Sequence, residues 1–153
     1  MTKLSNYASK SFLLVEDEPF MREVIERILK QAQAEQVFRA HDGAAALELL
    51  EEKALGVHCI ISDLHMKPMN GLQLLQAIRS GQNRRVRRDQ PFIMLTGTAE
   101  TEAVTAAISL DVHAYVLKPV SPEKLLAAID GLSKRKLEIK SAGHYSGIVL
   151  PPA

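Results

Sequence analysis

The sequence predicts an α/β fold: a doubly wound, five-stranded parallel sheet in the order 2-1-3-4-5, with five helices. The first observation behind this is an alternation, because five short apolar runs are each followed by a segment with helical spacing. Such alternation predicts parallel strands whose helices cover both faces of the sheet through right-handed crossovers. The second observation is that polar residues follow four of these runs, at the strand ends where open α/β sheets place their chemistry.

The apolar runs are short and are bounded by polar or turn-forming residues, which favours strands over helices. We expect strands at Ser11–Val15, Gln36–Ala40, Val57–Ser62, Pro91–Leu95 and Val112–Leu117. The run at 36–40 is the weakest of the five. In the order 2-1-3-4-5, the switch point lies between the first and third strands, where such folds form their ligand crevice.

The segments between the strands carry helix signals. Pro19 suits the first turn of a helix, and the apolar residues from Met21 to Leu29 recur at helical spacing. Asp42 is placed to cap the second helix, and Ser121 with Pro122 to start the last one. We expect helices at about 19–29, 42–53, around 74–78, 99–110 and 122–132.

Length and composition predict one globular domain. Of the 153 residues, we assign 1–10 to an N-terminal extension, 11–134 to the domain and 135–153 to a flexible C-terminal tail. A net charge of +1 gives no general attraction to nucleic acid or membrane, and the basic run Arg84–Arg88 is expected to be a solvated loop. The chain has one cysteine, no apolar stretch long enough to span a membrane and no signal-peptide pattern, so we expect a cytoplasmic protein.

The polar strand ends carry three acids, one hydroxyl and one lysine: Glu16, Asp17, Asp63, Thr96 and Lys118. Carboxylates gathered at one sheet edge suit Mg²⁺, which prefers oxygen ligands and is often held by one or two carboxylates plus a phosphate. A carboxylate can also attack phosphorus, with a metal and a fixed cation offsetting the charge. The sequence contains neither common glycine-rich phosphate loop, so we do not expect a bound nucleotide.

At this point the residues resemble the receiver domain of two-component response regulators. Each motif alone is weak, but all four occur in order at matching strand ends over roughly residues 11–134. The segments that carry the resemblance are Leu14–Glu18, Ser62–Gly71, Met94–Gly97 and Tyr115–Pro119. The resemblance implies that a histidine kinase or a phosphotransfer protein phosphorylates Asp63.

The resemblance also implies a magnesium site. Asp17 and Asp63 would bind Mg²⁺ directly, Glu16 through water, and His65 through its backbone carbonyl. Glu16 replaces a frequent aspartate, and Lys67 stands where proline is usual, so the loop after Asp63 is expected to follow a different path.

The same resemblance assigns a switch. Lys118 would pair with the phosphoryl group, Thr96 would turn its hydroxyl onto that group, and Tyr115 would follow. The Lys118–Pro119 bond would be cis, which the low isomer penalty of proline permits. His65 and Thr98 occupy positions that tune the lifetime of the phosphoryl group in the family.

Three functions remain open from the sequence. The leading one is a phosphorylation-activated response regulator receiver, a phosphoacceptor rather than an enzyme, signalling through contact with a downstream protein target. The second is a degenerate receiver that acts as a phosphorylation-independent adaptor. The third is a flavodoxin-like cofactor binder, suggested by Thr96-Gly97-Thr98 and the shared topology.

Overall fold

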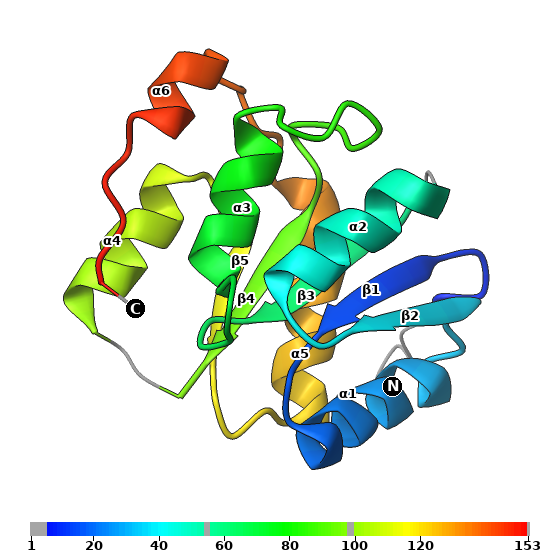
Figure 1. The fold of residues 1–153 in the computed structure, drawn as a ribbon. Helices are drawn as coiled ribbons and strands as arrows, with labels where there is room; N and C mark the ends of the chain where they lie inside the picture. The colour runs from blue at the N-terminus through cyan, green and yellow to red at the C-terminus, as the bar shows by residue number, and fades with distance from the viewer. Residues whose placement is uncertain (1–5, 54–55, 98–99, 153) are drawn as a thin grey trace.

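The computed structural model describes residues 6–53, 56–97 and 100–152, which form one five-stranded parallel sheet flanked by helices (Figure 1). The strand order is β2-β1-β3-β4-β5, as predicted. The strands are β1 (Ser11–Val15), β2 (Gln36–Ala40), β3 (Cys59–Asp63), β4 (Phe92–Thr96) and β5 (Ala114–Leu117). The described residues contain six α-helices and one short 3-10 helix, where the sequence predicted five helices.

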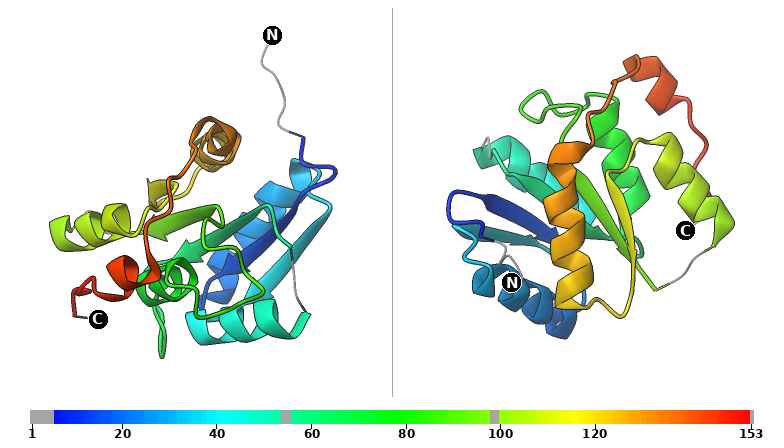
Figure 2. Two further views of the ribbon diagram at one scale, coloured as in Figure 1. Left: turned by 90° about the horizontal axis from the view of Figure 1, so that it is seen from above. Right: turned by 180° about the vertical axis from the view of Figure 1, so that it is seen from behind.

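The helices lie on both sides of the sheet (Figures 1 and 2). They are α1 (Pro19–Gln31), α2 (Gly43–Lys53), α3 (Gly71–Arg79), α4 (Thr101–Ser109), α5 (Pro122–Asp130), η1 (Gly131–Lys134) and α6 (Ala142–Ser146). The predicted start of the fourth helix at Ala99 lies outside the described residues. None of the described helices is both long enough and apolar enough to cross a bilayer.

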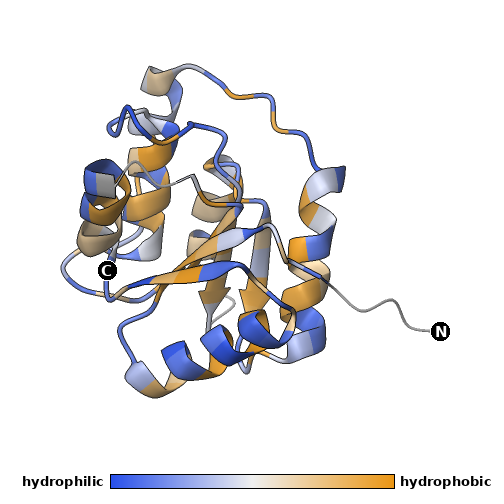
Figure 3. Cartoon of the chain, turned by 90° about the vertical axis from the view of Figure 1, so that its right-hand side faces the viewer, coloured by the Kyte–Doolittle hydropathy of each residue, from blue (hydrophilic) through white to orange (hydrophobic). Residues whose placement is uncertain are grey.

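Alternating strand residues feed two separate cores. Leu13, Ile60 and Phe92 point to the side covered by α2, α3 and α4. Their chain neighbours Phe12 and Ile61 point to the side covered by α1 and α5. Because both faces are covered, the inner strands are apolar up to the polar residues at their carboxyl ends, which explains their near-continuous hydrophobic sequence and the largely orange colour of the strands in Figure 3.

Side-chain caps set the helix starts nearest the sheet edge. Glu18 accepts hydrogen bonds from the Phe20 and Met21 N–H groups at the start of α1, and Asp42 accepts one from Ala45 N–H, as predicted for the second helix. Ser121 caps α5. The fifth strand begins later than predicted, at Ala114, because Val112 N–H still bonds to a carbonyl of α4.

The two chain ends pack on the domain. Tyr7, in the predicted N-terminal extension, is 2% exposed, and its hydroxyl donates to Asp130 at 2.9 Å. The sequence led us to expect a flexible tail from residue 135, but the structure differs: α6 packs beside α3, and Tyr145 is fully buried. The apolar spacing of this segment is too short to signal a helix, so its docking depends on tertiary contacts.

A buried arginine joins the loops at the amino end of the sheet. Arg79 is fully buried and donates to the backbone carbonyls of Arg88, Gln90, Leu110 and Asp111 at 2.6–3.0 Å. Burial lowers its pKa to about 10, which still leaves the guanidinium charged at neutral pH. Arg79 therefore holds the 80–91 loop and the turn before β5 in one arrangement.

Two members of the basic run also bind backbone. Arg85 donates to the Glu51 carbonyl at the end of α2, and Arg88 donates to the carbonyls of Arg79 and Lys140. These guanidinium groups satisfy orphan carbonyls and fix the loop, a structural role that needs no nucleic acid.

We expect Arg79→Met to lower the free energy of unfolding by about 2–4 kcal/mol, because four carbonyls, two of them in buried hydrogen bonds, would lose their donor. Urea unfolding followed by circular dichroism measures this loss. The exposed Arg84→Met is the matched control and should stay within about 0.5 kcal/mol of wild type. An unchanged unfolding midpoint for Arg79→Met would contradict this role.

His113 makes stability depend on pH. Its Nδ1 accepts the Phe92 N–H at 3.2 Å, and burial, with help from Arg79 and Arg135, lowers its pKa to about 4. The unfolded chain, with a histidine pKa near 6.5, takes up a proton that the folded state refuses, so stability falls as pH drops from about 6.5 to 4. Since the ring is partly exposed, we expect wild type to lose only about 1 kcal/mol more than His113→Gln between pH 7 and 5. An equal loss of unfolding free energy between pH 7 and 5 for the two proteins, measured by urea unfolding, would disprove this.

Candidate functional site

The predicted site residues meet at the carboxyl edge of the sheet. Glu16 and Asp17 follow β1, Asp63 ends β3, Thr96 ends β4, and Lys118 follows β5. Parallel pairing aligns these ends: Val15 lies opposite Ser62, Asp63 opposite Leu95, and Thr96 opposite Leu117. These five residues, which are spread over about one hundred positions of the chain, are thus neighbours in space, as the topology requires.

Three carboxylates form a compact cluster. Oxygen atoms of Glu16, Asp17 and Asp63 all lie within 4.8 Å of one another. Glu16 is 1% exposed and Asp63 6% exposed, whereas Asp17 faces solvent. The Leu64 N–H donates to Asp63 Oδ1 at 2.9 Å and fixes the orientation of that carboxylate.

Lys118 bridges the two buried acids. Its Nζ lies 3.2 Å from Glu16 Oε1 and 3.2 Å from Asp63 Oδ1. The lysine backbone is fixed as well, because its N–H donates to the Thr96 carbonyl at 2.7 Å. One ammonium group therefore compensates two nearly buried negative charges.

The charge balance of this cluster appears in its pKa values. Burial and the neighbouring Asp63 raise the pKa of Glu16 to about 7, against the attraction of Lys118. Partial burial acts to lower the pKa of Lys118, but Asp63 and Glu16 outweigh it and raise that pKa overall. With one cation for three carboxylates, the cluster keeps a net negative charge that a divalent cation would offset.

The donor set fits Mg²⁺. Magnesium takes oxygen ligands, accepts carboxylates from adjacent elements and retains several waters. Glu16, Asp17 and Asp63 offer such oxygens, and the exposure of Asp17 leaves room for water and a phosphate. His65 is exposed in the loop two residues after Asp63.

Thr96 and Tyr115 lie together at the same edge. Thr96 is fully buried, and it shares a side-chain hydrogen bond with the partly buried Tyr115. Burial raises the pKa of the Tyr115 phenol, while the bond with Thr96 acts in the opposite direction. Thr98 lies outside the described residues.

The loop after Asp63 contains features that the sequence reasoning missed. A Cβ at Gly71 would lie 2.4 Å from the Asp63 carbonyl, so a larger residue there would push β3 away from its position. Asn70 and Gln73 form a reciprocal capping box at the start of α3, a pattern visible in the sequence as Asn-x-x-Gln. Lys67–Pro68, in this loop, is a cis peptide bond that the sequence did not predict. Lys118–Pro119, after β5, is also cis, as the resemblance implied.

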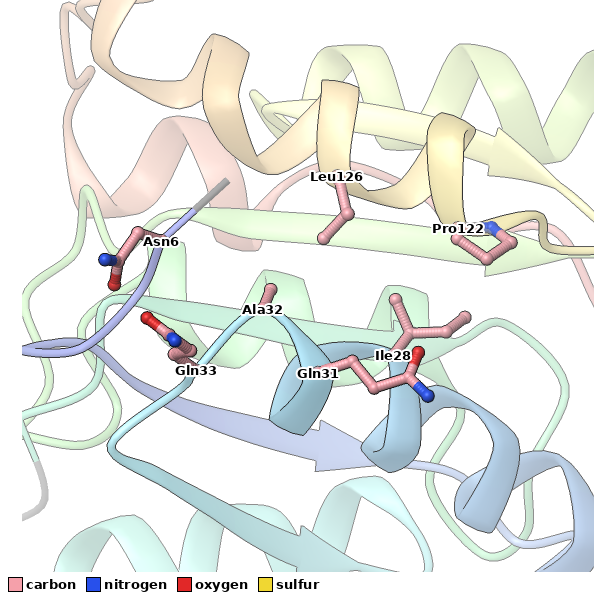
Figure 4. A pocket seen from close by; sticks show the side chains of 7 residues that line it. All are labelled: Asn6, Ile28, Gln31, Ala32, Gln33, Pro122 and Leu126. Atoms are coloured by element: carbon pink, nitrogen blue, oxygen red, sulfur yellow. The ribbon is translucent and has the colours of Figure 1, made fainter. Parts of the chain in front are cut away.

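A separate hollow lies between α1 and α5, and its lining includes none of the residues of the acid cluster (Figure 4). It has a volume of about 340 Å³ and combines apolar side chains with amides. The lining residues are Asn6, Ile28, Gln31, Ala32, Gln33, Pro122 and Leu126. None of them is ionisable or nucleophilic, so this hollow offers no chemistry comparable to the strand-end site.

Comparison with known protein sequences agrees with this arrangement of site residues. The response regulator receiver domain family matches residues 12–130. Chemotaxis protein CheY1 of Helicobacter pylori is 32% identical over 127 residues, which are 83% of this chain and 93% of that protein. Two-component response regulator ORR24 of rice is 33% identical over 86% of this chain, but the match spans only 20% of that longer protein.

Solved structures show the same fold. The chemotaxis protein CheY4 of Vibrio cholerae has a TM-score of 0.71 at 26% identity, covering 80% of this chain and 98% of that one. The receiver domain of the Arabidopsis thaliana histidine kinase CKI1, solved with Mg²⁺ and BeF₃⁻, has a TM-score of 0.74 at 23% identity, covering 84% and 93%. This chain therefore belongs to the response regulator receiver domain family, whose members bind Mg²⁺ at an acidic pocket and interact with histidine kinases or phosphotransfer proteins.

Two substitutions that break the same ion pair should have opposite effects on stability in metal-free buffer. We expect Asp63→Asn to raise the free energy of unfolding by about 1 kcal/mol, because it relieves repulsion with Glu16. We expect Lys118→Met to lower it by about 1–2 kcal/mol, because two buried carboxylates lose their cation. Urea unfolding measures both, with the exposed Lys124→Met as control. Losses of equal sign and size would show that the pair acts only as a simple salt bridge.

Proposed function

We propose that this chain is a phosphorylation-activated response regulator that accepts a phosphoryl group on Asp63 with Mg²⁺ bound. The single observation that carries the proposal is the position of the Asp63 carboxylate. It is nearly buried, oriented by the Leu64 N–H and 3.2 Å from the Lys118 ammonium, and it borders two further acids. Such a carboxylate is held in place, ready to act as a nucleophile.

The proposed reaction transfers a phosphoryl group from a donor to Asp63. An Asp63 carboxylate oxygen forms a bond to phosphorus as the bond between phosphorus and the donor breaks, and the donor leaves with that electron pair. The donor is a phosphohistidine of a kinase or phosphotransfer protein. Asp17, Asp63, water-mediated Glu16 and the His65 carbonyl would hold Mg²⁺, which offsets negative charge on the transferring group. Lys118 would exchange its contact with Asp63 for one with the new phosphoryl oxygens.

Thr96 and Tyr115 are proposed to form the switch. In the structure they share a hydrogen bond next to Asp63. A phosphoryl group would offer the Thr96 hydroxyl a stronger, charged acceptor, and the hydrogen bond between Thr96 and Tyr115 would break. Contacts made in only one of two states shift the equilibrium toward that state. The downstream protein target would recognise the shifted surface.

The other two functions have less support. A degenerate receiver would be expected to lack part of its site, whereas all five strand-end residues are present here: three acids and Lys118 lie together, and Thr96 ends β4 at the same edge. The flavodoxin-like cofactor binder gains nothing from the family match. No nucleic acid is proposed as a partner, because Arg85 and Arg88 already bind the backbone of their own chain. We propose a cytoplasmic location, where kinases draw phosphate from nucleoside triphosphates.

Incubation of the full chain with Mg²⁺ and acetyl phosphate tests the proposal. We expect one phosphate per chain, labile to hydroxylamine as an acyl phosphate is. We expect no labelling when the metal is chelated before acetyl phosphate is added. Asp63→Asn should abolish labelling, and the exposed Asp89→Asn, at the opposite sheet edge, should leave it unchanged. Intact-protein mass spectrometry gives the count. Failure of the wild type to gain this phosphate would refute the proposed function.

A further inference from the structure

The C-terminal segment is a strap that crosses α3 and runs along α4. We use this name for residues 139–152, which include α6 and are seen beside α3 and α4 in Figure 1. Ile148 and Leu150 turn toward the core shared by α3 and α4, while Val149 between them is 90% exposed. After α6, the strap therefore packs on the domain through alternate side chains, with the side chain between them facing solvent.

Tyr145 latches the strap to the domain. Its side chain is fully buried, and its hydroxyl donates to Asp111 Oδ2 at 2.6 Å while accepting the Lys140 N–H. The Arg88 guanidinium lies over the ring, 5.6 Å from its centroid. Asp111 belongs to the turn that links α4 to β5, so the latch connects the strap directly to the end of α4.

Gln76 of α3 fixes the strap a second time. Its amide nitrogen donates to the backbone carbonyls of Tyr145 and Ile148, at 2.9 and 2.8 Å. One side chain thus satisfies a carbonyl near the end of α6 and a second carbonyl just after it. These bonds set the position of the residues that continue along α4.

Helix α4 has little packing of its own. Its buried residues are the small Ala103, Ala106 and Ala107, and its largest apolar side chain, Ile108, is 59% exposed. Small side chains bury little apolar area, so they contribute little to holding a helix in one position. The strap adds the apolar side chains that α4 lacks. A groove of about 450 Å³ lies between them, lined by residues 148–152 and by Thr101, Glu102, Thr105, Ala106 and Ser109.

The position of α4 is tied to the phosphorylation site, because the helix begins five residues after Thr96. We propose that the strap is an autoinhibitory brace: it holds α4 in its unphosphorylated position and loosens when Asp63 is phosphorylated. This inference rests on the proposed function of Asp63. The strap contacts would exist fully only in the unphosphorylated state. Phosphorylation would therefore have to supply the free energy of those contacts in order to shift the equilibrium.

The test uses the full chain with Mg²⁺ and beryllofluoride, a stable mimic of the phosphoryl group. Tyr145→Phe removes the bonds to Asp111 and Lys140 but keeps the ring, and Gln76→Met removes both amide donors at similar volume. We expect each change to lower the half-saturating beryllofluoride concentration about threefold to fivefold, since the braced state competes less well. Amide NMR signals of β4 report the saturation.

Tyr7→Phe is the matched control. It deletes a hydroxyl from another buried tyrosine, bonded to Asp130 on the other side of the sheet, and should leave the half-saturating concentration unchanged. If Tyr7→Phe and Tyr145→Phe shift the titration equally, general loosening explains the effect and the brace is refuted.

A second readout follows the strap itself. The Ile148 N–H donates to the Tyr145 carbonyl at 3.2 Å, and its hydrogen exchange should accelerate at least about tenfold when beryllofluoride binds the wild type. Unchanged protection, or unchanged titrations for Tyr145→Phe and Gln76→Met, would overturn the brace while leaving phosphorylation intact. A wild type that does not bind beryllofluoride at all would instead overturn the proposed function.

Discussion

The Lys118 ammonium between Glu16 and Asp63 is the contact on which the rest of the site depends. Two nearly buried carboxylates repel each other and lose the stabilisation of water, so a nearby cation is needed to keep them charged. The lysine can reach both acids because parallel strands end together at one edge of the sheet. A third acid, exposed at the rim, leaves the cluster short of positive charge. That deficit suits a divalent cation and an incoming phosphoryl group.

Arginines play the corresponding part at the opposite edge. Arg79 is buried with its donors on four carbonyls, while Arg85 and Arg88 bind the ends of neighbouring segments. A charged run in a loop commonly suggests a polyanionic partner. Here the planar guanidinium groups satisfy backbone carbonyls that no helix or strand can satisfy. The basic run is therefore explained largely by the fold, and the reactive edge is left acidic.

The helix nearest the proposed switch is also the one with the smallest buried side chains. Helix α4 packs through alanines, and its position is completed by the strap and by the turn at Asp111. A switch needs an element whose two positions differ by little free energy, since a phosphoryl group makes only a few new contacts. Strong packing of α4 would oppose that change. The strap supplies an additional restraint on α4, through Tyr145 and through Ile148 and Leu150.

Much of this molecule follows from the sequence alone. The strand order, the helix caps at Asp42 and Ser121, and the meeting of Glu16, Asp17, Asp63, Thr96 and Lys118 at one edge follow from short-range periodicity and the rules of parallel sheets. The family match over residues 12–130 agrees with the motifs that the sequence displays. These features could be predicted because each rests on local spacing or on a topology with few alternatives.

Only the tertiary structure decided where the chain ends and the basic loop pack and which residues they contact. Tyr7 and Tyr145 lie in short polar segments, and nothing near them in sequence reveals that Asp130 and Asp111 will receive their hydroxyl groups. The clash that excludes a side chain at Gly71 and the four carbonyls around Arg79 likewise come from distant segments. Their partners are set by how the packed elements meet, and local sequence patterns carry no record of that meeting.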